Sequence, residues 1–185
     1  MLVEAAEETF ASRGYTQAGL AEVATLAGVS KTLLYHYFPD GRPELYREVI
    51  DRLTGQVVAA VREAARAPVS TGDRLRRLVR ALLTWFGEHP DAYRLLVLEP
   101  WGSGDPSVVA QATAVRARLA GELNTLLAPA GAPLPVTMAA GAATLGAVLQ
   151  VCELRLSGQV SDAEAVDVAE RFVGGGLAGL GLVDP

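Results

Sequence analysis

Apolar residues recur at intervals of three and four along most of this chain, the spacing that places them on one face of an α-helix. Val3, Ala6 and Phe10 follow this spacing, and Gly14 is placed to end their helix. No run of alternating β-branched residues is long enough for a strand ladder. The pattern therefore predicts an all-α protein, with later helices at about 43–66, 73–88, 91–99, 106–127, 135–157 and 162–180.

Residues 21–38, AEVATLAGVSKTLLYHYF, contain two helical patterns separated by only four residues, AGVS. The small Ala24 lets two helices cross closely, and Gly28 supplies a turn conformation that other residues adopt at a cost. Ser30 is a good N-cap for the second helix, because its hydroxyl can accept a hydrogen bond from a free backbone N–H. This spacing is the one that a helix-turn-helix unit requires.

The second of these helices begins at Lys31 and has two faces. Leu34 and Phe38 fall on the inward face, and Leu34 together with Val29 would fill the angle between the helices. The outward side chains can bind phosphates, hydrogen-bond base edges and contact the methyl group of thymine. We therefore predict that the helix enters the major groove of DNA, using Lys31, Thr32, Leu33, Tyr35, His36 and Tyr37.

Some of these outward residues also have simpler explanations. Tyr35 and Tyr37 can pack against the long helix that follows, and His36 can be a solvated surface residue. Lys31 is the only lysine in the chain, and it lies at a helix start, where the helix dipole disfavours a cation. That position favours a functional role for Lys31.

Charge gives no general attraction to nucleic acid. The formal net charge of the chain is -5, and residues 1–48 carry four basic and seven acidic side chains. If this part of the chain binds DNA, it does so through a few placed contacts and without a broad positive field.

Composition indicates a reducing compartment and a large core. Half of the chain is hydrophobic, and its single cysteine, Cys152, excludes an internal disulfide and is expected to pack as a small apolar group. We see no apolar run long enough to cross a bilayer, and the acidic start MLVEAAEETF is unlike a secretory or transit peptide. We expect a soluble, cytoplasmic protein with no membrane partner.

The segments FASRGYTQAG and AEVATLAGVSKTLLYHYFPDGRPELYREV closely resemble the TetR family of bacterial transcriptional regulators over about the first 50 residues. The resemblance implies a three-helix helix-turn-helix domain at 1–46 and a larger helical ligand-binding and dimerisation domain at 47–185. It also implies a repressor that binds double-stranded operator DNA as a homodimer and is released by a small-molecule effector. The matching positions are Phe10, Gly14, Tyr15, Val23, Ala24, Ala27, Gly28, Val29, Ser30, Leu34, Tyr35, Tyr37, Phe38 and Leu45.

Four features depart from the family pattern, and one of them is Thr32-Leu33 in place of a common Gly-Thr. Ala18 and Gly19 stand where a phosphate-contacting threonine is common, and no basic arm precedes the first helix, since the sequence begins at Met1. The usual lysine after the phenylalanine is replaced by PDGRPEL, in which Arg42 is the expected stand-in for its phosphate contact.

The last two predicted helices are crowded with alanine and glycine, in MAAGAATLGAVLQV and FVGGGLAGLGLV. Glycine inside a helix costs about 1 kcal/mol relative to alanine, so close approach of another helix is the expected compensation. We interpret the helices at about 135–157 and 162–180 as the homodimer face. A tight internal core is the alternative.

An effector is expected among the helices of residues 73–157. Apolar and aromatic side chains would line its pocket, with Glu99, Glu153 or Arg155 as polar selectors. Ordinary core packing explains each aromatic residue equally well. The predicted ligand-binding residues are Trp85, Phe86, Tyr93, Glu99, Trp101, Met138 and Cys152.

Enzymatic signatures are missing from the sequence. GEHPD is not a two-histidine zinc motif, no glycine-rich loop joins a strand to a helix, and no serine or cysteine has a recognisable base. We therefore predict no enzyme, no cofactor and no metal. The second hypothesis for function is a helical ligand- or partner-binding dimer that has lost specific DNA recognition.

Overall fold

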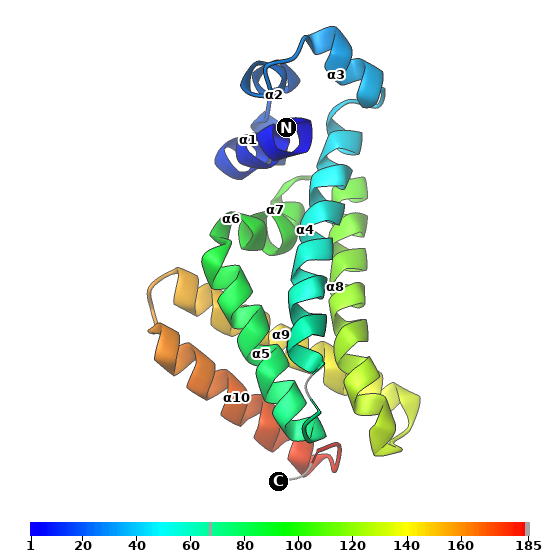
Figure 1. Ribbon diagram of the computed structural model, residues 1–185, viewed down its shortest axis with the longest axis vertical. Coiled ribbons are helices and arrows are strands. Elements are labelled where there is room, and N and C mark those ends of the chain that lie inside the picture. The colour runs from blue at the N-terminus through cyan, green and yellow to red at the C-terminus, as the bar shows by residue number, and fades with distance from the viewer. Residues whose placement is uncertain (67, 184–185) are drawn as a thin grey trace. The chain divides into compact units, whose positions relative to one another are not determined.

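The computed structural model describes residues 1–66 and 68–183, and every regular element in these ranges is helical (Figure 1), which confirms the all-α prediction. Ala67 of the predicted loop at 67–72, and Asp184 and Pro185 of the predicted C-terminal domain, lie outside the described residues. A π-helical segment and a 3-10 turn, η1 and η2, interrupt the α-helices. The elements are α1 (Leu2–Gln17), α2 (Leu20–Leu26), α3 (Lys31–Tyr37), α4 (Arg42–Ala65), α5 (Thr71–Glu88), α6 (Pro90–Tyr93), η1 (Arg94–Leu98), α7 (Glu99–Gly102), α8 (Pro106–Leu127), η2 (Ala128–Ala130), α9 (Leu134–Leu156) and α10 (Asp162–Gly179).

These elements group into two compact units. The first unit comprises residues 1–55 and 91–115, and the second comprises residues 56–90 and 116–185. Helices α4 and α8 each contribute residues to both units. The predicted domain boundary between residues 46 and 47 stays a prediction, and the grouping differs from it by placing 91–115 with the N-terminal helices.

The core of the first unit is built from the inward faces of α1 to α4. Phe10, Leu34 and Leu45 have no exposed surface, and the Phe10 ring meets the Tyr46 ring edge-on with their centroids 5.1 Å apart. The Tyr15 hydroxyl donates a hydrogen bond of 2.9 Å to Asp105 Oδ2, so the segment 91–115 contributes directly to this unit.

Helix α1 is kinked at the residue that we expected to end it. The helix continues to Gln17, but Gly14 has φ 74° and ψ 163°, which lies outside the helical region. A Cβ on Gly14 would lie 2.9 Å from Glu99 Oε2. The backbone conformation requires glycine, and a larger residue would also displace the Glu99 carboxylate.

The segment 91–102 differs from the prediction of one helix at 91–99 followed by a loop at PWGSGDP. It forms α6, the π-helical segment η1 and α7, so that Pro100 and Trp101 are helical. Proline has no N–H to donate to the carbonyl four residues earlier, which disfavours a continuous α-helix. The Glu99 N–H instead bonds Arg94 O, five residues back, and this is the π-helical register.

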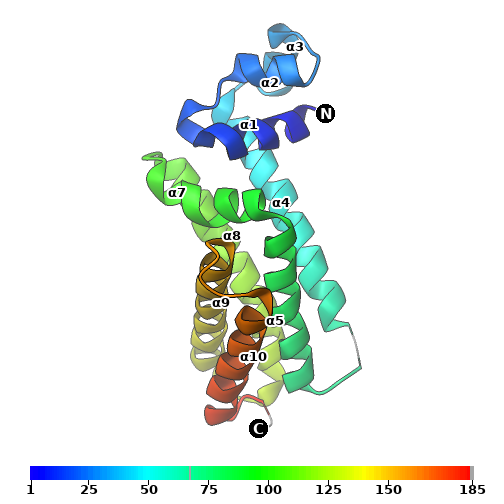
Figure 2. The same ribbon diagram turned by 90° about the vertical axis from the view of Figure 1, so that its left-hand side faces the viewer.

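Helices α5, α9 and α10 pack against one another in the second unit (Figures 1 and 2). A Cβ on Gly141 of α9 would lie 3.2 Å from Ala120 O, so this glycine permits close approach to α8. Arg155, near the end of α9, donates to Leu83 O of α5 and binds Asp162 of α10 with Nε 2.6 Å from Oδ1. One guanidinium therefore joins three helices.

Helix α9 corrects our expectation that no apolar run is long enough to cross a bilayer. Leu134–Leu156 has 23 residues and a mean hydropathy of 1.5 over its most apolar window, so it qualifies by length and composition. This helix packs against α5 and α10, and Leu145, Val148 and Cys152 are buried in the second unit. A core position accounts for these buried side chains, whereas Leu134 and Met138 of the same helix are exposed.

Candidate nucleic-acid interface and ligand cavity

Short-range hydrogen bonds fix the start of α3. Gly28 has φ 67°, and the Val29 N–H bonds Ala24 O at 2.9 Å, which ends α2 and turns the chain. Ser30 Oγ then accepts a hydrogen bond of 3.1 Å from the Leu33 N–H, so the predicted N-cap is present. Leu34 is completely buried and anchors α3 to the unit.

The remaining side chains of α3 face solvent. Lys31, Thr32 and His36 are exposed, and Leu33 at the margin of the face is 39% exposed. Helix α3 contains no acidic residue, so its outward face carries one lysine and one histidine without a carboxylate on the same helix. Such a face can accept a phosphate backbone and present donors and methyl groups to base edges.

The two tyrosines of α3 are not packed away against α4, the simpler explanation that the sequence left open. Tyr37 is 60% exposed, and its ring meets the His36 ring edge-on at 5.5 Å between centroids. Tyr35 is 42% exposed, and Lys31 Nζ lies 5.8 Å from its ring centroid. Both rings remain accessible to a partner.

Arg42 lies at the start of α4 and contacts the end of α1. Its Nη1 donates a hydrogen bond of 2.9 Å to Thr16 O, and its guanidinium lies 5.9 Å from the Tyr15 ring centroid. These contacts position α1 against α4. The phosphate contact expected of Arg42 stays a prediction.

Many acidic side chains of the first unit have partners within it. Arg52 lies 3.4 Å from Glu7 and 3.7 Å from Glu4, and Arg13 lies 3.4 Å from Glu22. Glu44 accepts a hydrogen bond from the Asp40 N–H. Several carboxylates of this region are therefore held in contacts away from α3.

The predicted ligand-binding residues are distributed over both compact units. Tyr93, Glu99 and Trp101 belong to the first unit, where Tyr93 is buried and Trp101 is 52% exposed. The second unit holds the other four, Trp85, Phe86, Met138 and Cys152.

Three of these four residues are buried, and one is on the surface. Phe86 is completely buried, and Cys152 is buried with the pKa of its thiol raised to about 12 by loss of solvent. Met138 is 55% exposed. Trp85 is buried as well, and it lines a cavity between α4 and α5.

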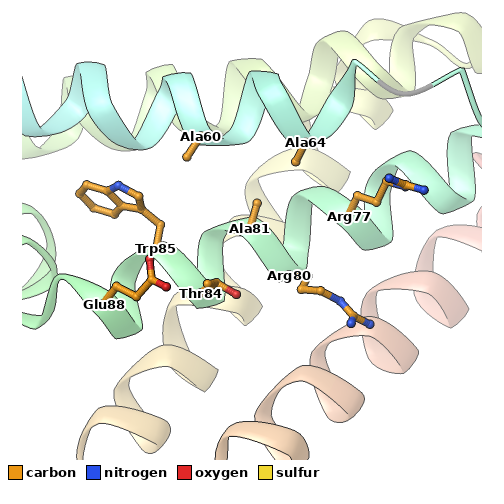
Figure 3. Close-up of a pocket in the computed structure, with 8 residues that line it drawn as sticks. All are labelled: Ala60, Ala64, Arg77, Arg80, Ala81, Thr84, Trp85 and Glu88. Atoms are coloured by element: carbon orange, nitrogen blue, oxygen red, sulfur yellow. The ribbon is translucent and has the colours of Figure 1, made fainter.

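This cavity has a volume of about 410 Å³, within the range of small-molecule sites. Trp85 is stacked on His89 with ring centroids 4.5 Å apart, which fixes the indole plane. Figure 3 shows Trp85 and Glu88 at one end and two arginines at the other, with alanines of both helices between them. The lining residues are Ala60, Ala64, Arg77, Arg80, Ala81, Thr84, Trp85 and Glu88.

Most of this lining was missed by sequence reasoning. Four-residue spacing places Arg77, Ala81 and Trp85 on one face of α5, and it places Ala60 and Ala64 on one face of α4. The sequence therefore predicts each of these two faces separately. Only the packing of α4 against α5 brings the two halves together.

Among the described residues, no group of three or more His, Cys, Asp or Glu side chains is placed to hold a metal ion.

The N-terminal helices thus define a helix-turn-helix protein: two short helices joined by a glycine turn, with the second one capped, anchored and exposed. Residues 2–49 match the family described as bacterial regulatory proteins, tetR family. The family and the relatives below are transcriptional regulators and not enzymes, as the sequence predicted.

One relative is the HTH-type transcriptional activator FasR of Mycolicibacterium smegmatis, 38% identical over 110 residues. The match covers 60% of this chain and 49% of that protein, so the chain spans about half the length of this curated relative.

Two solved structures share the fold over nearly the whole chain. A TetR-like transcriptional regulator from Rhodococcus sp. RHA1 has a TM-score of 0.76 at 25% identity, covering 96% of this chain and 94% of that one. FadR from Bacillus subtilis in complex with stearoyl-CoA has a TM-score of 0.77 at 16% identity, covering 99% and 96%. The second likeness concerns the fold alone.

Proposed function

We propose that this protein is a cytoplasmic, ligand-responsive transcriptional regulator that binds double-stranded operator DNA as a homodimer. The observation that carries the proposal is the state of α3. Leu34 anchors the helix at zero exposure, Ser30 caps it, and its polar stripe is free. In this proposal Lys31 and Arg42 bind phosphates, while the base edges and nearby backbone are contacted by Thr32, Leu33, Tyr35, His36 and Tyr37.

The proposed dimer face lies on α9 and α10. Phe172 is 70% exposed and Leu180 is 57% exposed, and both border an apolar groove of about 220 Å³ between these helices. A Cβ added to Gly174, Gly175 or Gly179 would meet no described atom within 4 Å. Internal packing therefore does not account for these glycines, which supports a second chain as the neighbour of α10.

The proposed effector occupies a cavity of the second unit and favours a state whose recognition helices are wrongly spaced for DNA. A ligand shifts such an equilibrium only by its difference in affinity for the two states. Helix α4 contributes residues both to the first unit and to the cavity lining, so it is our candidate for the coupling element. The FadR complex with stearoyl-CoA shows that a protein of this fold can hold a small molecule.

DNA binding is tested by fluorescence anisotropy with fragments from upstream of the protein's own coding sequence, over a series of salt concentrations. We expect salt-sensitive, sequence-preferring binding to an imperfect palindrome. Lys31→Ala should reduce the magnitude of the salt slope by about one phosphate contact. Arg118→Ala, which removes an exposed arginine of α8, is the matched control and should leave the slope unchanged.

Base readout and the sign of regulation need separate measurements. Thr32→Ala or His36→Ala should change the preferred sequence more than the salt slope. We propose repression, from the resemblance to the family, whereas the FasR relative is named as an activator. A promoter reporter decides, because deletion of the gene should raise expression if the protein represses and lower it if the protein activates.

The second candidate function is a ligand- or partner-binding dimer without specific DNA recognition. The excess of acidic over basic side chains in residues 1–48 favours it. Dimeric protein that shows no salt-sensitive, sequence-preferring binding to any operator-like fragment would support this candidate against the regulator.

A further inference from the structure

The cavity between α4 and α5 changes character along its length. Its middle is apolar, where Ala60 and Ala64 of α4 face Ala81 of α5, and Trp85 follows at one end (Figure 3). The opposite end carries Arg77, with Arg80 beside it. An apolar stretch that leads to a positive end matches a molecule with an apolar chain and an anionic head.

A second cavity of about 600 Å³ shares Arg77 and Arg80 with the first. Three arginines and two carboxylates line this second cavity, which therefore has an excess positive charge. Its lining residues are Val69, Asp73, Arg76, Arg77, Arg80 and Glu170.

Only one of these three guanidinium groups is left for a ligand. Arg76 Nη2 lies 2.8 Å from Asp73 Oδ1, and Arg80 Nη2 lies 2.8 Å from Glu170 Oε1. The pKa of Asp73 is lowered, first by the hydrogen bond from Arg76 and to a smaller extent by the charge of Arg77. Within the described part of the chain, Arg77 forms no hydrogen bond or ion pair of its own. It is the cation available to an anionic head group.

We propose that this site binds a single-chain anionic amphiphile, with its carboxylate or phosphate head at Arg77 and its alkyl chain along the alanines toward Trp85. This inference rests on the proposed function, because it names the chemical class of the effector. A cationic amphiphile would meet the arginines, and an uncharged one would leave Arg77 without a partner. Glu88, beyond Trp85, would repel a chain with a second anion at its far end.

The geometry also sets a length for the alkyl chain of the ligand. Arg77 and Trp85 are eight residues apart on α5, which corresponds to about 12 Å along the helix axis. Until the chain reaches Trp85, each added methylene should tighten binding by about fourfold. Past Trp85 the chain meets the Glu88 carboxylate and open solvent, so the gain per methylene should fall.

Trp85 supplies a direct readout of binding. The chain has two tryptophans, and the other, Trp101, is 52% exposed in the first unit. In a Trp101→Phe background the indole emission reports on the cavity alone. The full chain is titrated, without DNA, with hexanoate, octanoate, decanoate and tetradecanoate, and with decyl phosphate, decanol and decyltrimethylammonium, all below their micellar concentrations.

We expect saturable changes in emission for decanoate and decyl phosphate, weaker binding of decanol and no binding of decyltrimethylammonium. The comparison of decanoate with decyl phosphate distinguishes the two head groups. Arg77→Ala should weaken both anions by about fivefold and leave decanol unchanged, the effect of losing one partly exposed ion pair. Arg118→Ala should have no effect on any of these compounds.

Ala64→Phe fills the middle of the cavity and should abolish binding of every amphiphile. Circular dichroism should show that this variant stays folded. Equal affinity for decanol and decanoate, or an unchanged affinity for decanoate in Arg77→Ala or Ala64→Phe, would overturn the proposal. Operator binding, measured in the same samples, distinguishes failure of the amphiphile site from failure of the proposed regulator function. Operator binding without amphiphile binding overturns the site and keeps the DNA-binding regulator, whereas amphiphile binding without operator release keeps the site and contradicts the effector role.

Discussion

The phenolic hydroxyl of Tyr46 donates a hydrogen bond of 3.1 Å to the carbonyl oxygen of Leu95, and both residues are buried. Leu95 lies in the π-helical segment, five residues before Pro100, which has no N–H to offer in that register. The Glu99 N–H, which would bond this carbonyl in an α-helix, is used by Arg94 O. Tyr46 thus supplies a donor that the proline cannot.

Tyr46→Phe should therefore destabilise the fold by about 1–3 kcal/mol, because it leaves a buried carbonyl without a partner while changing little in shape. Urea unfolding followed by circular dichroism at neutral pH measures the free energy. Tyr35→Phe, at a ring that is 42% exposed, is the matched control and should change stability by less than about 0.5 kcal/mol. Equal effects of the two substitutions would contradict this account of η1.

Gly14→Ala should destabilise the first unit by about 1–3 kcal/mol. The substitution places a side chain at φ 74° and ψ 163°, a region that is essentially restricted to glycine, and brings its Cβ to 2.9 Å from Glu99 Oε2. Gly19→Ala is the control, since Gly19 has φ -92° and no described atom near the added Cβ. In a Glu99→Ala background the cost should shrink but not vanish, because the backbone strain remains; complete rescue would show that the carboxylate alone requires the glycine.

Gly87→Ala should act through a guanidinium. A Cβ on Gly87 would overlap Arg155 Nη1, which donates to Leu83 O while Arg155 Nε holds Asp162. The arginine would have to move and give up these contacts, at a cost of about 1–3 kcal/mol. The same substitution in an Arg155→Ala background should be nearly neutral, and this coupling is measured by a double-mutant cycle of urea unfolding. Additive effects would exclude the proposed clash.

Local rules predicted the part of the site that local contacts determine. The turn at Gly28, the cap at Ser30 and the buried Leu34 each depend on residues within a few positions of one another, so the sequence alone was sufficient to place α3. The capping box of Ser161 and Glu164 is equally local, and its S-x-x-E pattern is visible in the sequence.

Features that depend on distant segments were not predictable in the same way. The cavity requires Ala60 and Ala64 to face α5, and residue type did not reveal that packing. The sequence predicts Trp101 and Met138 as apolar lining, yet more than half of each residue is exposed. The π-helical register near Pro100 is not predictable from local rules, because the freed Leu95 carbonyl is satisfied by Tyr46, far away in sequence.

Alkaline pH should weaken the first unit through Tyr15. Burial, and then the hydrogen bond to Asp105, raise the pKa of Tyr15 from 10.0 to about 12. A raised pKa in the folded state means that, above pH 10, the unfolded chain loses this proton first and binds fewer protons than the native chain. The stability due to Tyr15 is thus fully present below pH 10 and is lost as pH rises toward about 12.

Urea unfolding at a series of pH values from 8 to about 11.5 tests this window. The wild-type free energy of unfolding should fall with pH above 10, and Tyr15→Phe should flatten the decline because the variant has no proton to lose at this position. Some decline should remain, since burial also raises the pKa of Tyr46. Asp105→Asn keeps a hydrogen-bond acceptor but removes the negative charge, so it should give an intermediate slope. A Tyr15→Phe slope equal to that of the wild type would show that Tyr15 does not titrate differently in the folded and unfolded chains.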